Sequence, residues 1–406
     1  MMVLPPMTSA ARLSLVVAMM AILAACAQRA DPALVPAPTV TSPPGMPAPP
    51  VPVEPSASPG APARPPAPVV VPRLDVPRPD DVRRLLGALS ADSMEGRGTG
   101  TPGSARAARL IADRMAAAGL VPAGDSGFFQ RVPLRRAVSQ RTGRLSASAV
   151  RTWADFNALP ADQRTIGVNV VGILTGTDSA LRSQAVLVDA HYDHVGIGPA
   201  VNGDSIYNGA DDDGSGTVAV VEIARILAAR GGNKRTIIFA ATTGEEVGLV
   251  GTNWYIAHPP FPLSQTVANF EIEMIGRPDS LSGGAGTGWL TGYGLSTMGP
   301  MLAAAGIPVV ADPRPDQQFF QRSDNIAFAR LGIVAHTWSS FNLHDDYHQV
   351  TDDVSKVDFD HMARLIDAAA RAVWVLANGE PPMWNPGGQP AARTPRLVQP
   401  PMRPPR

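Results

Sequence analysis

Cysteine is almost absent from this chain, since only one of its 406 residues is a cysteine. A single cysteine excludes an intramolecular disulfide and any structural zinc site built on several thiolates. An excess of one charge is also lacking, because 34 lysine and arginine residues oppose 35 aspartate and glutamate residues, giving a formal net charge of −1. With no basic run, the electrostatic footprint of a nucleic-acid-binding protein is missing. We therefore expect no nucleic-acid partner.

Proline is sparse in the middle of the chain and concentrated near its ends. Of 42 prolines, 18 lie in residues 31–79 and 9 lie in residues 381–406. Segments of Pro, Ala and Val with few charges favour extended polyproline II over a packed core. We expect four parts, which are a signal peptide in residues 1–25, a tether in 26–79, one large domain in 80–380 and a disordered tail in 381–406.

The N-terminal segment predicts export. Residues 13–22 form an apolar run that is too short to span a membrane and has the length of a signal-peptide core. The next four residues, Leu-Ala-Ala-Cys, resemble a bacterial lipobox, which implies lipidation of Cys26. The resemblance also implies an outer membrane location facing the periplasm or the cell surface, because Ala27 is not the aspartate that commonly retains lipoproteins at the inner membrane. The alternative is an ordinary secretory signal with an incidental cysteine.

Apolar runs and helical patterns alternate along the large domain. The runs predict strands, the helical spacing predicts helices, and fully apolar strands separated by helices imply a sheet buried on both faces. We therefore expect an α/β fold, a three-layer α/β/α sandwich with a mixed, mostly parallel central sheet. The expected strands are residues 168–174, 185–188, 236–242 and 266–272, and the expected helices are residues 80–89, 104–119, 217–230 and 250–258.

Polar residues follow the expected strands, where reactive groups gather in an open α/β sheet. His191 and Asp193 follow the second strand, and such a pair can supply a metal ligand and the group that orients it. A hydrogen-bonded structural histidine is the alternative. Residues 211–213 are three aspartates that precede a helix. They indicate either a solvated helix N-terminus or, with two cations close by, a carboxylate that bridges two metals.

Two further strands end in carboxylates. Glu245 and Glu246 follow the third expected strand, and adjacent side chains on an extended segment point in opposite directions. One glutamate can therefore ligate a metal while the other serves as a general base, as metal-assisted hydrolysis requires. Glu273 follows the fourth strand, and His348, with Tyr347 beside it, offers a second ligand histidine.

The order of these motifs resembles peptidase family M28, co-catalytic dizinc peptidases that are mostly aminopeptidases. The resemblance covers about residues 85–376 and includes the segment Met-Glu-Gly-Arg-Gly-Thr-Gly-Thr-Pro-Gly-Ser at 94–104. It implies the zinc exopeptidase fold and two zinc ions per chain. The implied ligands are His191, Asp212 and Glu273 for one ion and Asp212, Glu246 and His348 for the other, with Asp212 as the bridge.

The resemblance also implies roles for residues beside the ligands. Asp193 would orient His191, and Glu245 would be the general base. Tyr347 would polarise the scissile carbonyl, with core packing as the alternative. Arg322 could contact substrate, although a surface arginine is an equal alternative.

Three smaller expectations complete the site. Glu273 stands where many family members have aspartate, so the affinity and metal preference of that site can differ from those of the family. The hard-oxygen content of both sites also keeps manganese or cobalt possible, although imidazole with carboxylate suits zinc. The family pattern implies a cis peptide bond between Asp212 and Asp213. We expect the remaining histidines to be structural or exposed: His194, His258, His336, His344 and His361. Three tryptophans could line a pocket, but core or surface packing is the preferred interpretation: Trp153, Trp289 and Trp338.

The sequence thus predicts a lipid-anchored zinc aminopeptidase acting on peptides with a free N-terminus. Glu245 would accept a proton from the attacking water and return it to the leaving amine. One alternative is a glutaminyl cyclase, which resembles these peptidases but works with one zinc. The other is a catalytically inactive binding module of the same fold. The complete set of ligand residues opposes both.

Overall fold

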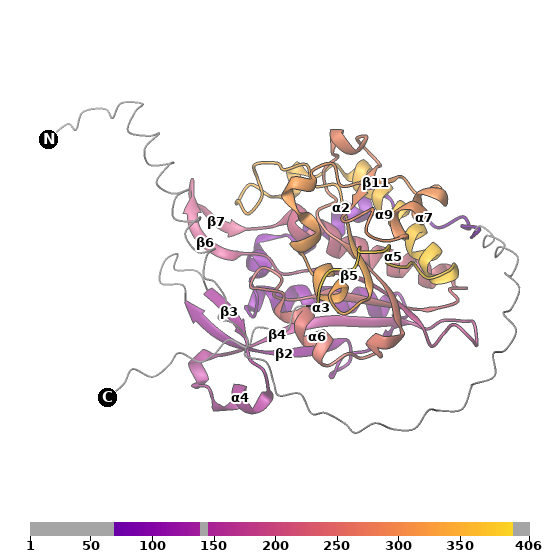
Figure 1. Ribbon diagram of the computed structural model, residues 1–406. Helices are drawn as coiled ribbons and strands as arrows, with labels where there is room; N and C mark the ends of the chain where they lie inside the picture. The colour runs from indigo at the N-terminus through magenta and orange to yellow at the C-terminus, as the bar shows by residue number, and fades with distance from the viewer. Residues whose placement is uncertain (1–68, 139–144, 393–406) are drawn as a thin grey trace, which may run out of the picture. The chain divides into compact units, whose positions relative to one another are not determined.

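The computed structural model describes residues 69–138 and 145–392 (Figure 1). The expected signal peptide, Cys26 and most of the expected tether lie outside the described residues, as does the end of the expected tail, residues 393–406. Among the helices that the structure describes, none is both long enough and apolar enough to cross a membrane.

A ten-stranded sheet forms the middle layer, with the order β11-β10-β12-β9-β5-β8-β4-β2-β3 and β1 paired to β4. Its four central strands, β12, β9, β5 and β8, are parallel, whereas β4 and β10 continue the sheet antiparallel on either side. The strands are β1 (Val121–Pro122), β2 (Phe129–Val138), β3 (Leu145–Ala149), β4 (Arg164–Leu174), β5 (Ala185–His191), β8 (Thr236–Thr242), β9 (Thr266–Ile272), β10 (Gly288–Leu290), β11 (Val309–Ala311) and β12 (Val334–Ser339). A separate hairpin pairs β6 (Gly196–Val201) with β7 (Asp204–Tyr207).

Helices cover both faces of this sheet. One face packs against α2 (Pro79–Leu89), α3 (Pro102–Ala117), α5 (Gly216–Arg230) and α9 (Phe359–Asn378), and the other against α6 (Val250–Ala257) and α8 (Asn325–Ala329). Shorter helices are α4 (Trp153–Ala158), α7 (Met298–Ala304), the π-helical turn η3 (Ala210–Ser215) and the 3-10 turns η1 (Asp92–Arg97), η2 (Ala161–Gln163), η4 (Leu263–Gln265), η5 (Ser280–Ser282), η6 (Pro315–Gln317), η7 (Phe319–Gln321) and η8 (Val354–Lys356).

The central strands are apolar along their whole length because both of their faces are buried. In β5, Val186 and Val188 pack toward α5 and α9, while Leu187 between them packs toward α6 and α8. This alternation is the period of two expected for a strand. The predicted α/β fold with three layers is confirmed, although within the described sheet only the four central strands and the β10–β11 pair are parallel.

Residues on both sides of the expected domain at 80–380 pack against it. On the N-terminal side, Leu74 is buried against the main core. On the C-terminal side, the Trp384 indole N–H donates to the Gly332 carbonyl at 2.9 Å, and the Asn385 N–H donates to the Leu295 carbonyl at 2.9 Å. The first part of the expected tail is therefore part of the domain, because its tryptophan and apolar residues pack despite the surrounding prolines.

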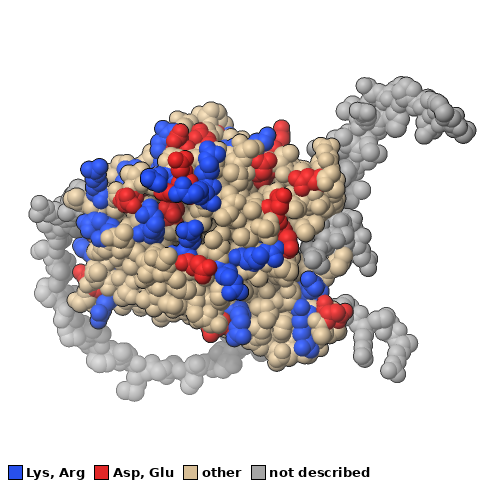
Figure 2. Space-filling model, turned by 180° about the vertical axis from the view of Figure 1, so that it is seen from behind, with Lys and Arg blue, Asp and Glu red and all other residues tan. Residues whose placement is uncertain are grey.

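Charges of both signs are interspersed on the face seen in Figure 2, in keeping with the net charge of −1. Acidic and basic side chains form local ion pairs on the surface of the described residues, such as Arg131 with Asp125 at 3.0 Å.

Candidate metal centre and active site

The carboxyl ends of the parallel strands bring most of the site residues to one edge of the sheet. His191 is the last residue of β5, Glu245 and Glu246 follow β8, and Glu273 is the first residue after β9. Because β5 pairs in parallel with both β8 and β9, these ends lie side by side. His348 comes from the loop between β12 and α9.

The three consecutive aspartates in the turn η3 have different roles. Asp213 Oδ1 accepts the backbone N–H of Met274 at 3.0 Å, and Asp211 Oδ1 accepts the N–H of Gly276 at 2.7 Å. These two carboxylates therefore tie the turn to the loop that follows Glu273. Asp212 between them directs its carboxylate to the site, and the Asp212–Asp213 peptide bond is cis, as expected.

Asp352 fixes the same turn from the loop that carries His348. Its buried carboxylate accepts the backbone N–H groups of Asp211 and Asp212 at 3.0 to 3.1 Å. A second link runs from the Ala210 N–H to the Asp352 carbonyl at 3.0 Å. The spacing between Asp212 and His348 is thus set by hydrogen bonds that involve neither side chain.

The first candidate metal-binding group consists of His191, Asp212 and Glu273. His191 Nε2 lies 3.5 Å from Asp212 Oδ1 and 3.9 Å from Glu273 Oε1. The other ring nitrogen, Nδ1, donates to the backbone carbonyl of Asp193 at 3.1 Å. This hydrogen bond orients the ring, so Nε2 faces the two carboxylates and can ligate a metal ion that displaces its proton.

The second group consists of Asp212, Glu246, His348 and His194. His348 Nε2 lies 3.0 Å from Asp212 Oδ2 and 3.2 Å from Glu246 Oε1. His194 Nδ1 lies 3.0 Å from the same Glu246 oxygen. Asp212 therefore turns one carboxylate oxygen to each group, which is the arrangement of a bridging ligand.

The donor atoms of both groups fit divalent metal ions. Within each group, one atom from every residue lies within 4.8 Å of all the others. His191 Nε2, Asp212 Oδ2 and Glu246 Oε1 are buried and have no hydrogen-bond partner among the described residues. Buried polar atoms are normally paired, so these atoms fit ligation, and imidazole with carboxylate is a donor set that suits zinc.

The two ligand histidines hold protons in the absence of metal. Burial opposes the charge of His348, but Asp212 and Glu246 outweigh it and raise the pKa of His348 to about 10. Burial likewise opposes the charge of His191, yet facing carboxylates led by Glu273 raise its pKa well above the usual value. Metal ions and protons therefore compete for the same nitrogens, and metal binding releases protons.

Glu245 lines the pocket and belongs to neither candidate metal group. Burial raises the pKa of its carboxyl well above the usual value, and the nearby carboxylates of Glu273, Asp324 and Glu246 raise it further. The backbone N–H of Glu245 donates to Asp193 Oδ1 at 3.2 Å. The neighbouring Glu246 differs, because His194 and His348 face its carboxylate, outweigh the effect of burial and lower its pKa.

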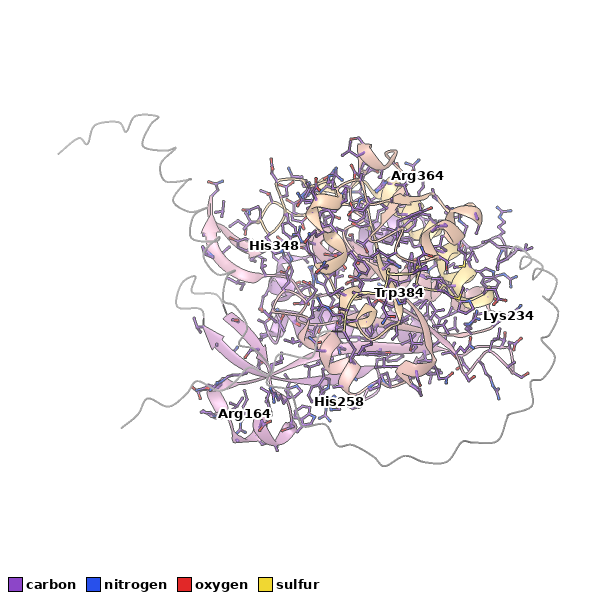
Figure 3. The ribbon with its side chains drawn as sticks, viewed as in Figure 1. Arg164, Lys234, His258, His348, Arg364 and Trp384 are labelled. Atoms are coloured by element: carbon purple, nitrogen blue, oxygen red, sulfur yellow. The ribbon has the colours of Figure 1, made fainter. Side chains whose placement is uncertain are left out.

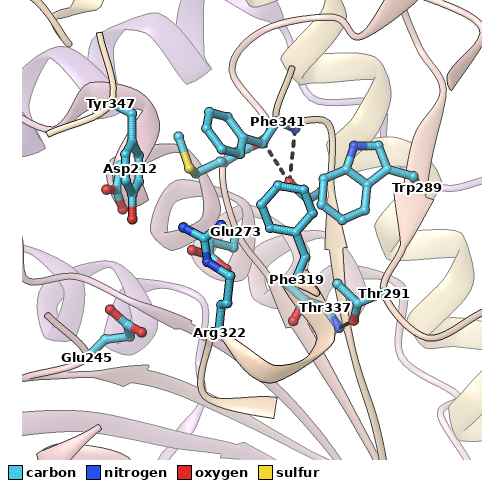
Figure 4. A pocket seen from close by; sticks show the side chains of 12 residues that line it. Asp212, Glu245, Glu273, Trp289, Thr291, Phe319, Arg322, Thr337, Phe341 and Tyr347 are labelled. Carbon is cyan, nitrogen blue, oxygen red and sulfur yellow. Dashed lines mark hydrogen bonds between the residues drawn. The ribbon is translucent and has the colours of Figure 1, made fainter. Parts of the chain in front are cut away.

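An aromatic pocket adjoins the two groups (Figure 4). Its wall includes Trp289, Phe319 and Phe341, with ring centroids 5.2 Å apart for the first pair and 5.9 Å for the second. Tyr347 and Arg322 also line it, and the Arg322 guanidinium lies 5.1 Å above the Phe319 ring. For Trp289, packing was the preferred expectation and lining a pocket the alternative, and the structure places it in the pocket wall.

Tyr347 stacks on His348 with ring centroids 3.9 Å apart. Burial, followed by the nearby carboxylates of Asp212 and Glu273, raises the pKa of its phenol. The hydroxyl group therefore stays protonated at neutral pH and can donate a hydrogen bond to a ligand in the pocket.

Just over half of the chain matches a known family, since the profile of Peptidase family M28 covers residues 169–373, which are 205 of 406 residues. This chain belongs to peptidase family M28. Aminopeptidase YwaD of Bacillus subtilis (strain 168) is 35% identical over 109 residues, which make up 27% of this chain and 22% of the relative. A probable zinc metalloprotease of Pyrenophora tritici-repentis is 27% identical and covers 55% of this chain and 43% of the relative. The chain thus spans less than half the length of these curated relatives.

The M28 fold is also found among solved structures. A zinc aminopeptidase from Bacillus subtilis superposes with a TM-score of 0.54 at 16% sequence identity and covers 75% of this chain and 97% of that structure. At this identity the likeness concerns the fold alone.

The structure brings together the residues that the sequence singled out for the metal groups and the adjoining pocket. The five expected ligands form the two groups, while Glu245, Tyr347 and Arg322 line the adjoining pocket. Asp193 was expected to orient His191, and it does so through its backbone carbonyl, which accepts the ring N–H. Its carboxylate, 3.8 Å from that nitrogen, accepts the Thr99 hydroxyl at 2.7 Å and the Glu245 N–H.

Sequence reasoning missed two residues of this M28 site. His194 was expected to be structural or exposed, but it is buried within the second metal group. Its spacing from His191 was the available signal. Arg97 belongs to the motif at 94–104 and received no role.

Arg97 is completely buried, and its guanidinium donates hydrogen bonds to backbone carbonyls rather than to carboxylates. Its guanidinium donates to the carbonyls of Tyr192 at 2.6 Å, Asn208 at 2.5 Å and Gly209 at 2.7 Å. Tyr192 directly follows the ligand His191, and Asn208 and Gly209 precede the aspartate turn. Arg97 therefore holds two ligand-bearing segments together, and its cation lies among the buried carboxylates of the site.

Proposed function

We propose that this M28 protein is a metal-dependent aminopeptidase that binds two zinc ions and hydrolyses the N-terminal peptide bond of peptides. The observation that carries the proposal is the position of Asp212 between two ligand groups, with Glu245 on the same pocket wall outside both groups. A bridging carboxylate and a free base beside it are the parts that two-metal hydrolysis requires. The family membership supports peptides as substrates.

Bound metal ions would make a water molecule more acidic and would polarise the scissile carbonyl group. The residues of this chain supply the proton transfers and the positioning. Glu245 accepts a proton from the attacking water at its carboxylate and returns it to the nitrogen of the leaving amine. The Tyr347 hydroxyl donates to the carbonyl oxygen as negative charge develops there.

The pocket sets the orientation of the substrate. Glu245 and Glu273 present carboxylates toward it, so a positively charged N-terminus is attracted to this end. The aromatic wall of Trp289, Phe319 and Phe341 then receives the side chain of the first residue. Such a wall favours apolar side chains over charged ones.

Aminoacyl chromogenic substrates test this function directly. The zinc-loaded protein should hydrolyse substrates with a free α-amine, and N-acetylation of the same substrates should abolish turnover. Equal turnover of both forms would contradict an aminopeptidase. Cyclisation of an N-terminal glutamine without peptide hydrolysis would favour a cyclase, and zinc binding without turnover of any peptide would favour a binding module.

Export and anchoring form the second part of the proposal and rest on the sequence alone. The apolar run at 13–22 and Cys26 support a lipoprotein held at the outer membrane and facing the periplasm or the cell surface. Labelled fatty acid supplied to cells should be incorporated into the protein, and Cys26→Ser should remove the label. A labelled Cys26→Ser protein would contradict lipidation at this residue.

A further inference from the structure

His194 departs from the three-residue ligand set that the motifs imply for the second metal ion. Its ring is buried, and both ring nitrogens lack a hydrogen-bond partner by the criteria of distance and angle among the described residues. A histidine in a core normally has such a partner, as His336 does with the Ser296 hydroxyl and the Thr291 carbonyl. The Nδ1 atom of His194 instead points to Glu246 and Asp212.

The distances between the donor atoms match a tetrahedral site. Zinc bonds of about 2.0 to 2.1 Å give a tetrahedron with edges of about 3.3 Å. His194 Nδ1 lies 3.0 Å from Glu246 Oε1 and 3.6 Å from Asp212 Oδ2. The corresponding edges from His348 Nε2 are 3.2 Å and 3.0 Å. Both histidines therefore approach the same pair of carboxylate oxygens in the same way.

The two rings come from different sides of the group. Their centroids are 5.5 Å apart and their planes are inclined by 74°, so each nitrogen can point to a common centre without a clash between the rings. Packing holds the His194 ring in this position. A Cβ atom on Gly209 would come within 2.4 Å of the ring, and Gly209 has a left-handed φ of 56°, so this position favours glycine.

We propose that His194 is a fourth protein ligand for the second metal ion, through Nδ1, together with Asp212, Glu246 and His348. This inference rests on the proposed function, because it concerns the same dinuclear site. With four protein ligands, this group should retain its ion more firmly than the three-ligand group of His191, Asp212 and Glu273, which keeps the more open position for water or substrate.

A crystal structure of the zinc-loaded protein, with anomalous data at the zinc edge, tests the ligand directly. We expect a peak about 2.0 to 2.1 Å from His194 Nδ1. A zinc peak more than 3 Å from Nδ1, with that nitrogen donating to Glu246, would overturn the proposal and leave the aminopeptidase function intact. Failure of the protein to bind zinc at all would instead count against the proposed function.

Variants provide a second test with zinc content as the readout. In His194→Asn the amide nitrogen takes the place of Nδ1, so the variant can still donate a hydrogen bond to Glu246 but lacks the imidazole ligand. We expect His194→Asn to weaken zinc binding at one of the two sites by more than about 100-fold, beyond the 10- to 100-fold typical of an outer partner. Retention of two tightly bound zinc ions by a folded His194→Asn protein would overturn the proposal.

His258→Asn is the matched control. His258 is an exposed histidine next to α6 that stacks on Trp254 at 4.0 Å between ring centroids. It lies well away from His348 (Figure 3). This variant should retain two zinc ions, so that loss of zinc from His194→Asn alone identifies a ligand. If His194→Asn does not fold, the crystal structure of the unaltered protein still decides the question.

Discussion

At the scale of single residues, identical side chains do different work according to the atoms around them. Glu245 and Glu246 are sequence neighbours, yet two histidines contact Glu246 while Glu245 faces the pocket. Asp211, Asp212 and Asp213 show the same division between holding backbone and facing the metal groups. The residue type therefore identifies the candidate site residues, and the contacts of each side chain determine its role.

Substitution separates the base from the ligand. Glu245→Gln keeps the size of the side chain but removes the proton acceptor, so turnover should fall by about 10² to 10⁴ while zinc stays near two ions per chain. Glu246→Gln removes an anionic ligand, so its zinc content should fall. Metal analysis beside steady-state rates checks both variants. Zinc loss from Glu245→Gln, or two tightly bound ions in Glu246→Gln, would reverse the two roles.

The sequence identified the metal-ligand residues better than the residues that position them through hydrogen bonds to the backbone. His191, Asp212 and Glu273 could be recognised because they follow apolar strands in a family order. Arg97 and Asp352 act on backbone groups of segments distant in sequence, and the side-chain pattern gives no measure of such contacts. His194 was missed because a histidine near a ligand motif is more often a packing residue.

At the scale of elements, the long apolar strands were predicted well. The strands β8 and β9 have the expected bounds, and β5 extends three residues beyond its apolar run to include His191. The three-residue strands β10 and β11 were not predicted, because such short segments show no periodicity. Their pairing depends on neighbours such as β12, which is also where His336 lies.

Histidine 336 makes the stability of this part of the sheet depend on pH. Burial lowers the pKa of His336 to about 4, whereas an unfolded histidine titrates near 6.5. Between these two values the unfolded chain binds more protons than the folded protein, so stability falls as the pH decreases from about 6.5 to about 4. From pH 7 to pH 5 this residue should cost about 2 kcal/mol of the free energy of unfolding.

Denaturant unfolding of wild type and His336→Gln at both pH values checks this. Glutamine does not titrate, so the difference in unfolding free energy between pH 7 and pH 5 should shrink by about 2 kcal/mol, whatever the stability of the variant at pH 7. The same difference in both proteins would show that His336 does not titrate in this range. His361 is buried and has a pKa lowered to about 4 as well, so part of the pH dependence should remain in the variant.

At the scale of the whole molecule, the site depends on segments more than 150 residues apart meeting at one sheet edge. The parallel strands β5, β8 and β9 supply three of these segments, the turn η3 with Asp212 supplies a fourth, and the loop after β12 supplies a fifth. The alternation of apolar runs and helical patterns in the sequence predicts this architecture. The sequence pattern did not predict that Leu74 and Trp384 pack against the domain, because their packing depends on surfaces formed by other parts of the chain.

Zinc titration of the metal-free chain, with aminopeptidase turnover measured in the same samples, tests the two-metal account most directly. The account predicts saturation at two zinc ions per chain, release of protons on binding, and turnover that appears only with metal. Proton release follows from the raised pKa values of His191 and His348. Saturation at one ion per chain, or full turnover of the metal-free chain, would contradict a dinuclear site centred on Asp212.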